Sequence, residues 1–247
     1  MKHSRTGGFM RLHTALVCVS FLAASMLAHG STLVIDNFTC AASVSQTGFN
    51  NTSSLVSCPG SLGGERGDTI FITSFTGSFT TAENSVSTMN SNPPTGAITG
   101  LIGTDLIGDD VMTWFGSTTP GVWNLPNLDL VGDSILVQIE SDSGGTLDLS
   151  LGSGSSSVGN RSDYSATFPV SSSFVDVLIP LTNPTGLVGT GADVGDVTAI
   201  GLIVGVPGGG SYTIDGVDAV PTPEPSTLLF TSFCFLGILT RSVWRRS

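Results

Sequence analysis

The chemistry open to the central part of this chain is set first by the side chains it lacks. Between Ser31 and Val220 there is no lysine and no histidine, and two arginines, Arg66 and Arg161, stand against 18 acidic residues. A Ser-His-Asp triad, a Cys-His pair, a Schiff-base lysine and an imidazole metal ligand are therefore excluded. Carboxylate chemistry remains, either hydrolysis of glycosidic bonds or binding of a hard cation through oxygen. With 18 acidic residues, pairs at almost any spacing occur by chance, so their presence does not indicate a glycosidase. We expect no catalytic residue and no enzyme activity.

Two tryptophans are the side chains best suited to contact a sugar ring. Trp114 and Trp123 flank a turn-rich segment from Gly116 to Gly121. An aromatic ring on a loop can stack on a sugar through its apolar face, whereas a tryptophan near a strand end more often packs against a core. The pair is our candidate ligand site, with core packing as the alternative.

The cysteines predict a disulfide in the body. Cys18 and Cys234 lie in apolar terminal segments, which leaves Cys40 and Cys58. An even pair in an exported protein indicates a disulfide, with two free thiols as the alternative. In the chain-entropy model a loop of this size gives about 3 kcal/mol of stabilisation.

The first 30 residues have the three parts of a signal peptide. Three basic residues precede the apolar run Ala15–Ala28, and small residues permit cleavage after Gly30. The apolar run is short for a membrane span. We therefore expect export and removal of residues 1–30, with a membrane anchor as the alternative.

The last 27 residues combine three features in a fixed order. Pro223, Glu224 and Pro225 precede an apolar stretch, Leu228 to Leu239, and three arginines follow it. The prolines hold the chain extended, and arginines behind an apolar helix mark the cytoplasmic side of a membrane. This order resembles the PEP-CTERM sorting signal of exported bacterial proteins, with an ordinary tail anchor as the alternative.

The PEP-CTERM resemblance implies a processing partner and a destination. Proteins with this tail are processed by an exosortase, a membrane protease, and are associated with exopolysaccharide and biofilm. By resemblance, Pro223, Glu224 and Pro225 form the recognition motif, and residues 221–247 pass through the inner membrane transiently as a short transmembrane helix. The body would then reach the outer surface or the extracellular matrix of a Gram-negative bacterium.

Alternating apolar residues predict an all-β body. The segments Ser134–Glu140, Thr146–Leu151, Ser162–Phe168 and Ser173–Leu181 alternate with the period of two that is typical of half-buried strands. Turn signals separate them, no amphipathic helix is predicted, and Gly48 to Gly64 is predicted to be a long loop. Further strands are predicted at Thr32–Phe38, Thr69–Phe75, Ser78–Ala82, Gly96–Ile102, Val197–Val204 and Ser211–Val217.

Strands in this number and spacing predict one antiparallel β-sandwich or jelly roll over residues 31–220. The runs FVDVLIPL from Phe174, DVGDVTAIGLIV from Asp193 and YTIDGVDAV from Tyr212 resemble the C-terminal half of galactose-binding-like jelly rolls. The run VIDNF from Val34 is similar to their first strand. Many carbohydrate-binding modules share this architecture.

The jelly-roll resemblance also implies a structural calcium ion between the first and last strands. Asp36 or Asp215 would supply its oxygen ligands, since Ca²⁺ prefers carboxylates and carbonyls. Calcium is the only cofactor that the sequence suggests. The alternative is that the acids form a solvated surface that keeps an exported protein soluble.

The charge balance limits the partners. The formal net charge is −11, and the stretch between Ser31 and Val220 alone carries −16, so we expect no nucleic acid partner. The prediction is an exported, exosortase-processed envelope or matrix protein with a non-catalytic β-sandwich, linked to exopolysaccharide or biofilm. The alternative is a carbohydrate-binding module of the jelly-roll type.

Overall fold

The computed structural model describes the body of the chain, in residues 32–92, 95–117, 122–154 and 159–222. The signal peptide predicted for residues 1–30 and the sorting motif at Pro223, Glu224 and Pro225 lie outside the described residues. Thr32–Val220 forms one compact unit. None of the helices in the described part of the chain has the length and apolar character needed to cross a membrane.

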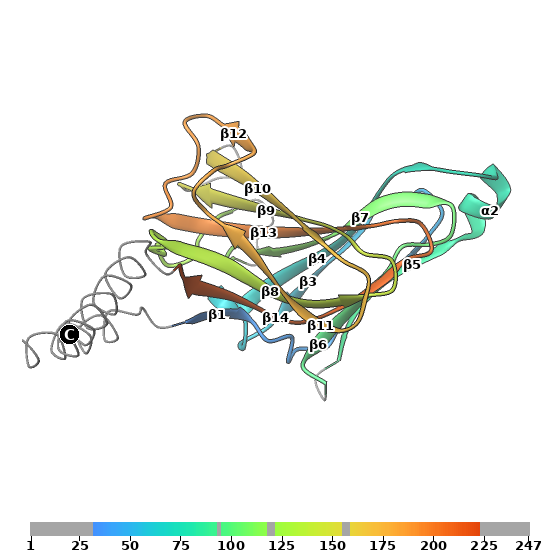
Figure 1. Ribbon diagram of the computed structural model, residues 1–247, viewed down its shortest axis with the longest axis horizontal. Helices are drawn as coiled ribbons and strands as arrows, with labels where there is room; N and C mark the ends of the chain where they lie inside the picture. The colour runs from blue at the N-terminus through green and yellow to red at the C-terminus, as the bar shows by residue number, and fades with distance from the viewer. Residues whose placement is uncertain (1–31, 93–94, 118–121, 155–158, 223–247) are drawn as a thin grey trace, which may run out of the picture. The chain divides into compact units, whose positions relative to one another are not determined.

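Fourteen described strands form two sheets of seven strands each, and every pairing found among them is antiparallel (Figure 1). The predicted two-sheet antiparallel sandwich is therefore confirmed. Sheet A has the spatial order β11 (Ser171–Pro180), β8 (Asp133–Ser141), β14 (Ser211–Pro221), β6 (Ala97–Leu101), β5 (Val86–Asn92) and β2 (Ala42–Thr47), with β1 (Leu33–Asp36) paired to β14. Sheet B has the order β12 (Gly186–Val188), β10 (Asn160–Phe168), β9 (Gly145–Ser153), β13 (Val197–Val206), β7 (Leu106–Trp114), β4 (Glu65–Phe75) and β3 (Thr52–Ser57).

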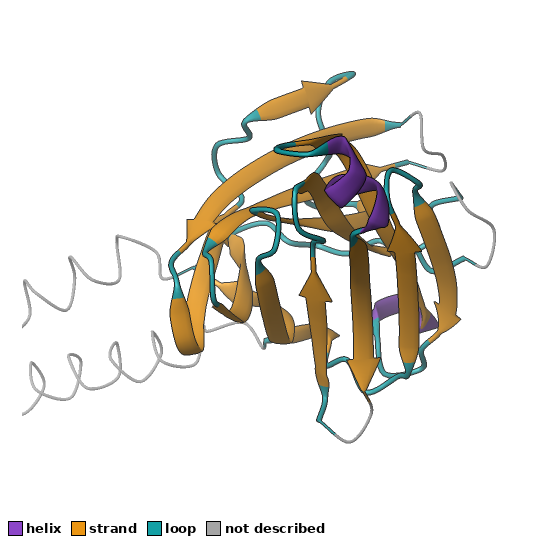
Figure 2. Ribbon diagram, turned by 90° about the vertical axis from the view of Figure 1, so that its right-hand side faces the viewer, coloured by secondary structure: helices purple, strands orange, loops and turns teal. Residues whose placement is uncertain are grey.

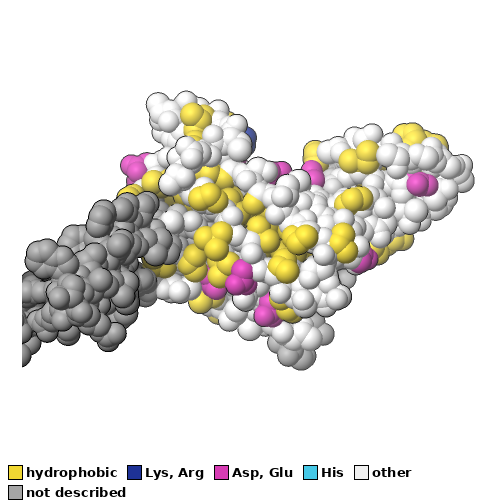
Figure 3. All heavy atoms as spheres, viewed as in Figure 1, with side chains coloured by type: hydrophobic (Ala, Val, Ile, Leu, Met, Phe, Trp, Pro, Cys, Tyr) yellow, Lys and Arg dark blue, Asp and Glu magenta, His cyan; other side chains and the backbone are white. Residues whose placement is uncertain are grey.

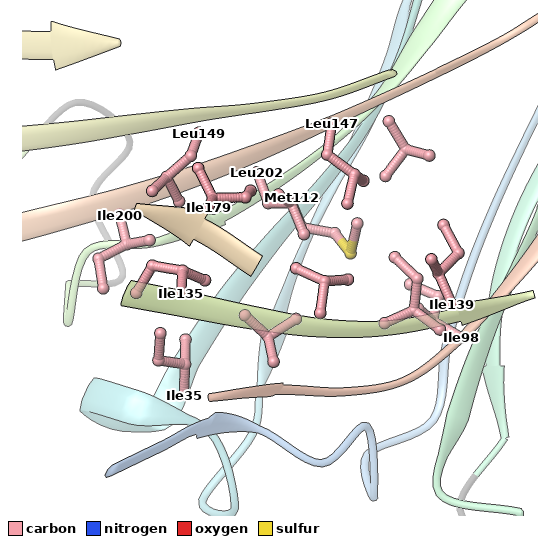
Figure 4. Close-up of a cluster of buried hydrophobic side chains, with 14 of the residues drawn as sticks. Ile35, Ile98, Met112, Ile135, Ile139, Leu147, Leu149, Ile179, Ile200 and Leu202 are labelled. Carbon is pink, nitrogen blue, oxygen red and sulfur yellow. The ribbon is translucent and has the colours of Figure 1, made fainter. Parts of the chain in front are cut away.

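The core lies between the two sheets, and period-two alternation builds it. Successive side chains of a strand point to opposite faces, so every second residue of a strand in a sandwich is apolar and buried. Figure 4 shows such side chains from both sheets meeting in one cluster. Its fully buried members include Ile135, Val137 and Ile139 of β8, Leu147, Leu149 and Leu151 of β9, and Leu202 and Val204 of β13.

Two of the predicted elements are wrong, and five strands were not predicted: β2, β3, β5, β7 and β12. Ser78–Ala82, predicted to be a strand, belongs to the short helix α2 (Phe79–Asn84), which lies at one end of the sandwich (Figure 2). The predicted loop from Gly48 to Gly64 contains strand β3 and a 3₁₀ turn, η1 (Leu62–Gly64). Strand β7 was not predicted, because Gly108 and Asp110 occupy two of its buried positions and interrupt the apolar alternation. Its Asp110 is buried, and the polar contact that makes this tolerable is described below.

Cys40 and Cys58 are joined by a disulfide. The bond ties the residues that follow β1 to the end of β3, and Cys58 has no exposed surface. The segment it encloses carries β2 and β3, which are the edge strands of sheets A and B. The disulfide therefore fixes one side of the sandwich, where both sheets end.

Removing this disulfide should destabilise the body by about 3 kcal/mol, because the unfolded chain regains the entropy of an open loop of this size. Urea unfolding of the Cys40→Ser/Cys58→Ser double variant against the native protein measures the difference. As an independent check, the denatured native protein should not react with a thiol reagent at Cys40 or Cys58 until a reductant is added. Equal labelling with and without reductant would contradict the bond.

Candidate functional site

A buried ionic cluster occupies the space between β1 and β4. The Arg66 guanidinium contacts Asp36 Oδ2 at 3.0 Å through Nη1 and both oxygens of Asp68 at 2.9 and 3.1 Å through Nε and Nη2. All three side chains are buried. Burial alone would lower the pKa of Arg66, but the two carboxylates raise it, while burial raises the pKa of Asp68 against the opposing pull of Arg66.

Trp114 belongs to the same cluster, which corrects one part of the predicted ligand site. Its indole Nε1 donates a hydrogen bond to Asp36 Oδ2 at 2.9 Å, and its side chain has no exposed surface. A fully buried indole cannot stack on a sugar, so the prediction of a sugar contact is wrong for Trp114. The alternative, core packing, holds for this residue.

The predicted calcium ligands are not brought together either. Strands β1 and β14 do pair, as the jelly-roll resemblance implies, but Asp36 points into the core and Asp215 is exposed. The Asp36 carboxylate already accepts bonds from the Phe38 backbone N–H at 2.7 Å, from Arg66 and from Trp114. Among the described residues, no three His, Cys, Asp or Glu side chains are grouped to hold a metal. Asp36 and Asp215 therefore do not form one set of calcium ligands in the described part of the chain.

A second buried contact joins the sheets. Tyr212 of β14 donates its hydroxyl to Asp110 Oδ2 of β7 at 2.9 Å, and Asp110 Oδ1 has no partner among the described residues. A side chain at Gly100 would overlap both groups, so this glycine makes the contact possible. Burial raises the pKa of Asp110 to about 7 and that of Tyr212 well above its ordinary value. Neither side chain is exposed enough to meet a ligand, which makes the pair structural.

An open cavity of about 510 Å³ lies over strands β8, β11 and β14 of sheet A, and we call it the β8–β11–β14 cavity. A β-bulge in β11 lies at one side of this cavity. Ser171 of β11 pairs with Ser141 of β8, and Val175 pairs with Ile139, so three β11 residues stand opposite Glu140 alone. Ser172, in the bulged segment, is one of the residues that line the cavity. The cavity is lined by Glu140, Ser141, Asp142, Val170, Ser171, Ser172, Ser211, Tyr212 and Thr213.

The electrostatics of the β8–β11–β14 cavity are acidic. Asp142 accepts the Ser211 backbone N–H at 2.8 Å and the Ser211 hydroxyl at 2.7 Å, and these bonds lower the pKa of Asp142. The Glu140 carboxylate has no hydrogen-bond or ion-pair partner among the described residues. No basic side chain lines the cavity. On the face drawn in Figure 3, acidic side chains outnumber basic ones.

Trp123 lies on the other sheet. Its indole lies against Gly152 of β9, where any side chain would overlap the ring. Side chains of β9 point alternately to the two faces of sheet B, and those of Leu149 and Leu151 face the core. Position 152 therefore faces outward, and the Trp123 ring against it covers part of the outer face of sheet B. It is partly exposed. Trp114 and Trp123 therefore do not form one site, and only Trp123 remains accessible to a ligand.

Sequence reasoning missed the β8–β11–β14 cavity. The alternation of Ile135, Val137 and Ile139 does place Glu140 on the outer face of β8, beside a serine- and glycine-rich turn. The bulge of β11 opposite Glu140 depends on the register in which β11 pairs with β8. This register cannot be predicted from the apolar pattern of either strand alone.

Comparison with known proteins finds no matching family model and no match among the curated proteins. Similar solved structures exist. The family 11 carbohydrate-binding module from Clostridium thermocellum, in complex with a β-1,3-1,4-mixed-linked tetrasaccharide, is 14% identical over 77% of this chain and 96% of that chain, at TM-score 0.37. A family 29 carbohydrate-binding module from Piromyces equi is 11% identical over 73% of this chain and 93% of that chain, at TM-score 0.35. Identities and scores of this size do not carry the ligands of those modules over to this chain.

Proposed function

We propose that the β-sandwich of this chain binds a polysaccharide without catalysing a reaction, in the β8–β11–β14 cavity. The observation that carries the proposal is the cavity itself, in which carboxylates and hydroxyls from neighbouring strands converge beside the apolar side chain of Val170. A concave site with a few convergent polar groups is the usual form of a small-ligand site. Hydroxyl-rich ligands suit it, because serine and threonine hydroxyls both donate and accept hydrogen bonds.

A binding role fits this site better than hydrolysis. A glycosidase needs a carboxylic acid that keeps its proton near neutral pH, and such acids have a raised pKa. Asp142 has a lowered pKa, and both its oxygens accept bonds from Ser211. It is therefore an ionised acceptor of hydrogen bonds and no proton donor.

Filling the cavity should abolish polysaccharide binding. In a glycan array probed with the full-length protein, Thr213→Tyr should reduce binding at least tenfold, because the new ring occupies the cavity that Thr213 lines. Ser45→Tyr is the matched control, since Ser45 is exposed at the outer edge strand β2 of the same sheet. Binding that survives Thr213→Tyr but is lost in Trp123→Ala would move the site to sheet B.

We further propose that the chain is exported and that its tail is processed. The Cys40–Cys58 disulfide supports export, because such bonds persist in oxidising compartments. The tail with Pro223, Glu224 and Pro225 supports processing by an exosortase. In this proposal the chain passes through the inner membrane as an intermediate and then reaches the outer surface or matrix, where an exopolysaccharide is its partner.

Intact-mass analysis of the native protein tests this proposal. In a strain with an active exosortase, the mature protein should lack residues 1–30 and the apolar segment from Leu228 to Arg246. Deleting the exosortase should leave the tail attached. A mature species that retains Leu228 to Arg246 in the active strain would refute the sorting proposal and leave the cavity proposal untouched.

A further inference from the structure

We propose that the ligand of the β8–β11–β14 cavity carries a protonated amine on a hydroxyl-rich ring, which is the chemistry of a polysaccharide with free amino sugars. This inference rests on the proposed function and narrows it from polysaccharides in general to one class. It follows from the charge of the cavity, from the lack of any cation among the described residues that could neutralise it, and from the side-chain groups left free in it.

The charge of the cavity is negative and fixed. Glu140 and Asp142 are its only charged side chains, and no basic residue lines it. Asp142 is held in place by two bonds from Ser211, so its orientation is set before a ligand arrives. A glycan that carries carboxylates or sulfates would be repelled here, because like charges brought together cost free energy.

Neither of the two arginines among the described residues can neutralise the carboxylates of the cavity. Arg66 is fully buried between Asp36 and Asp68. Arg161 is on β10 of sheet B, where its Nε lies 3.1 Å from Asp163 Oδ1. No basic side chain in the described part of the chain therefore balances Glu140, and a ligand that brings its own cation has the advantage.

The remaining lining is suited to the ring that bears the amine. The hydroxyls of Ser172 and Thr213 make no hydrogen bond with another described residue, so both can donate to and accept from ring hydroxyls. Val170 is 65% exposed and offers an apolar surface to the C–H face of a ring. Each Asp142 oxygen has a second lone pair beyond the one that Ser211 uses. A bare amine would use the carboxylates and leave these other groups unused.

Three tetrasaccharides with the same β-1,4 backbone test the inference by calorimetry with the full-length protein. They are the glucosamine tetramer, its fully N-acetylated form and cellotetraose, which differ in the group at carbon 2. The glucosamine tetramer should bind at least tenfold more tightly than the other two, as expected of a charge-assisted bond. Higher salt should weaken its binding, because screening weakens the attraction between exposed charges.

Two variants locate the effect. Glu140→Gln keeps the shape of the side chain and removes its charge, and it should cost the glucosamine tetramer about tenfold in affinity. Asp215→Asn removes one charge from an exposed position of β14 outside the cavity, and it should change little. Spermidine, an amine without a sugar ring, should bind more weakly than the tetramer.

The outcomes separate the two proposals. Equal affinity for the three tetramers, with Thr213→Tyr abolishing all of them, would overturn the amine inference and keep polysaccharide binding. Spermidine binding as tightly as the tetramer would overturn the sugar part of the inference. Absence of binding to these tetramers and to every glycan of the array would overturn the proposed function itself.

Discussion

Replacing Arg66 with methionine should lower the free energy of unfolding by about 3–5 kcal/mol at neutral pH. Asp36 and Asp68 would be left in the core without their counter-charge, and breaking a buried pair on one side costs that much. Trp114 would remain a neutral partner of Asp36, to which its indole donates a hydrogen bond, whereas Asp68 and Ser91 would both lose their bonds to the guanidinium. Urea unfolding followed by circular dichroism measures the loss.

Arg161→Met is the matched control for this experiment. Arg161 pairs with Asp163 at the surface, where the two side chains are 47% and 27% exposed, and such pairs contribute under about 1 kcal/mol. A triple variant that also carries Asp36→Asn and Asp68→Asn should recover part of the loss, because it removes the unpaired charges. If Arg66→Met costs no more than Arg161→Met, the buried cluster does not stabilise the fold as described.

The unfolding free energy should fall by about 4 kcal/mol at most as the pH rises from 4 to 7, through Asp110. Burial raises the pKa of Asp110 from 3.8 to about 7. Between these two values the unfolded state has lost the proton and the folded state has kept it, so rising pH favours unfolding. Each unit of pKa difference contributes about 1.4 kcal/mol. Below pH 4 and above pH 7 this contribution no longer changes with pH.

Asp110→Asn should flatten this pH dependence, because the variant has no proton to lose. Asp68, Asp109, Asp133 and Asp218 also have raised pKa values, so a shallower slope of the same sign should remain. Asp215→Asn, at an exposed position, should leave the slope unchanged. The same slope between pH 4 and pH 7 in the native protein and in Asp110→Asn would show that Asp110 is not the group responsible.

Period-two alternation was a sound guide to the strands that are apolar on one face. Strands β8, β9 and β10 lie where the pattern placed them, because their buried residues recur at every second position. The pattern failed for β7, in which Asp110 occupies a buried position that its contact with Tyr212 makes acceptable. It also failed at Ser78–Ala82, since five residues are too few to separate a strand from one helical turn.

The candidate site was less predictable than the fold. The residue types were partly informative, since Trp114 and Asp36 do form polar contacts of the core. The direction in which these side chains point was not predictable, because the neighbouring sequence does not show whether a side chain faces the core or the solvent. Asp36 points inward and accepts bonds from Arg66 and Trp114, which are 30 and 78 residues away in the sequence, and such contacts depend on the assembled sandwich. The bulge of β11 opposite Glu140 likewise depends on how β11 pairs with β8.

The central claim, that the β8–β11–β14 cavity binds a polysaccharide, is tested most directly by locating the bound ligand. Full-length protein labelled with ¹⁵N should be titrated with the glucosamine tetramer while amide chemical shifts are recorded by NMR. We expect the amide signals of Glu140, Asp142, Ser172 and Thr213 to shift together and saturate, while those of Gly152 and Trp123 do not change. Shifts that saturate at Gly152 and Trp123, with the cavity amides unchanged, would contradict it.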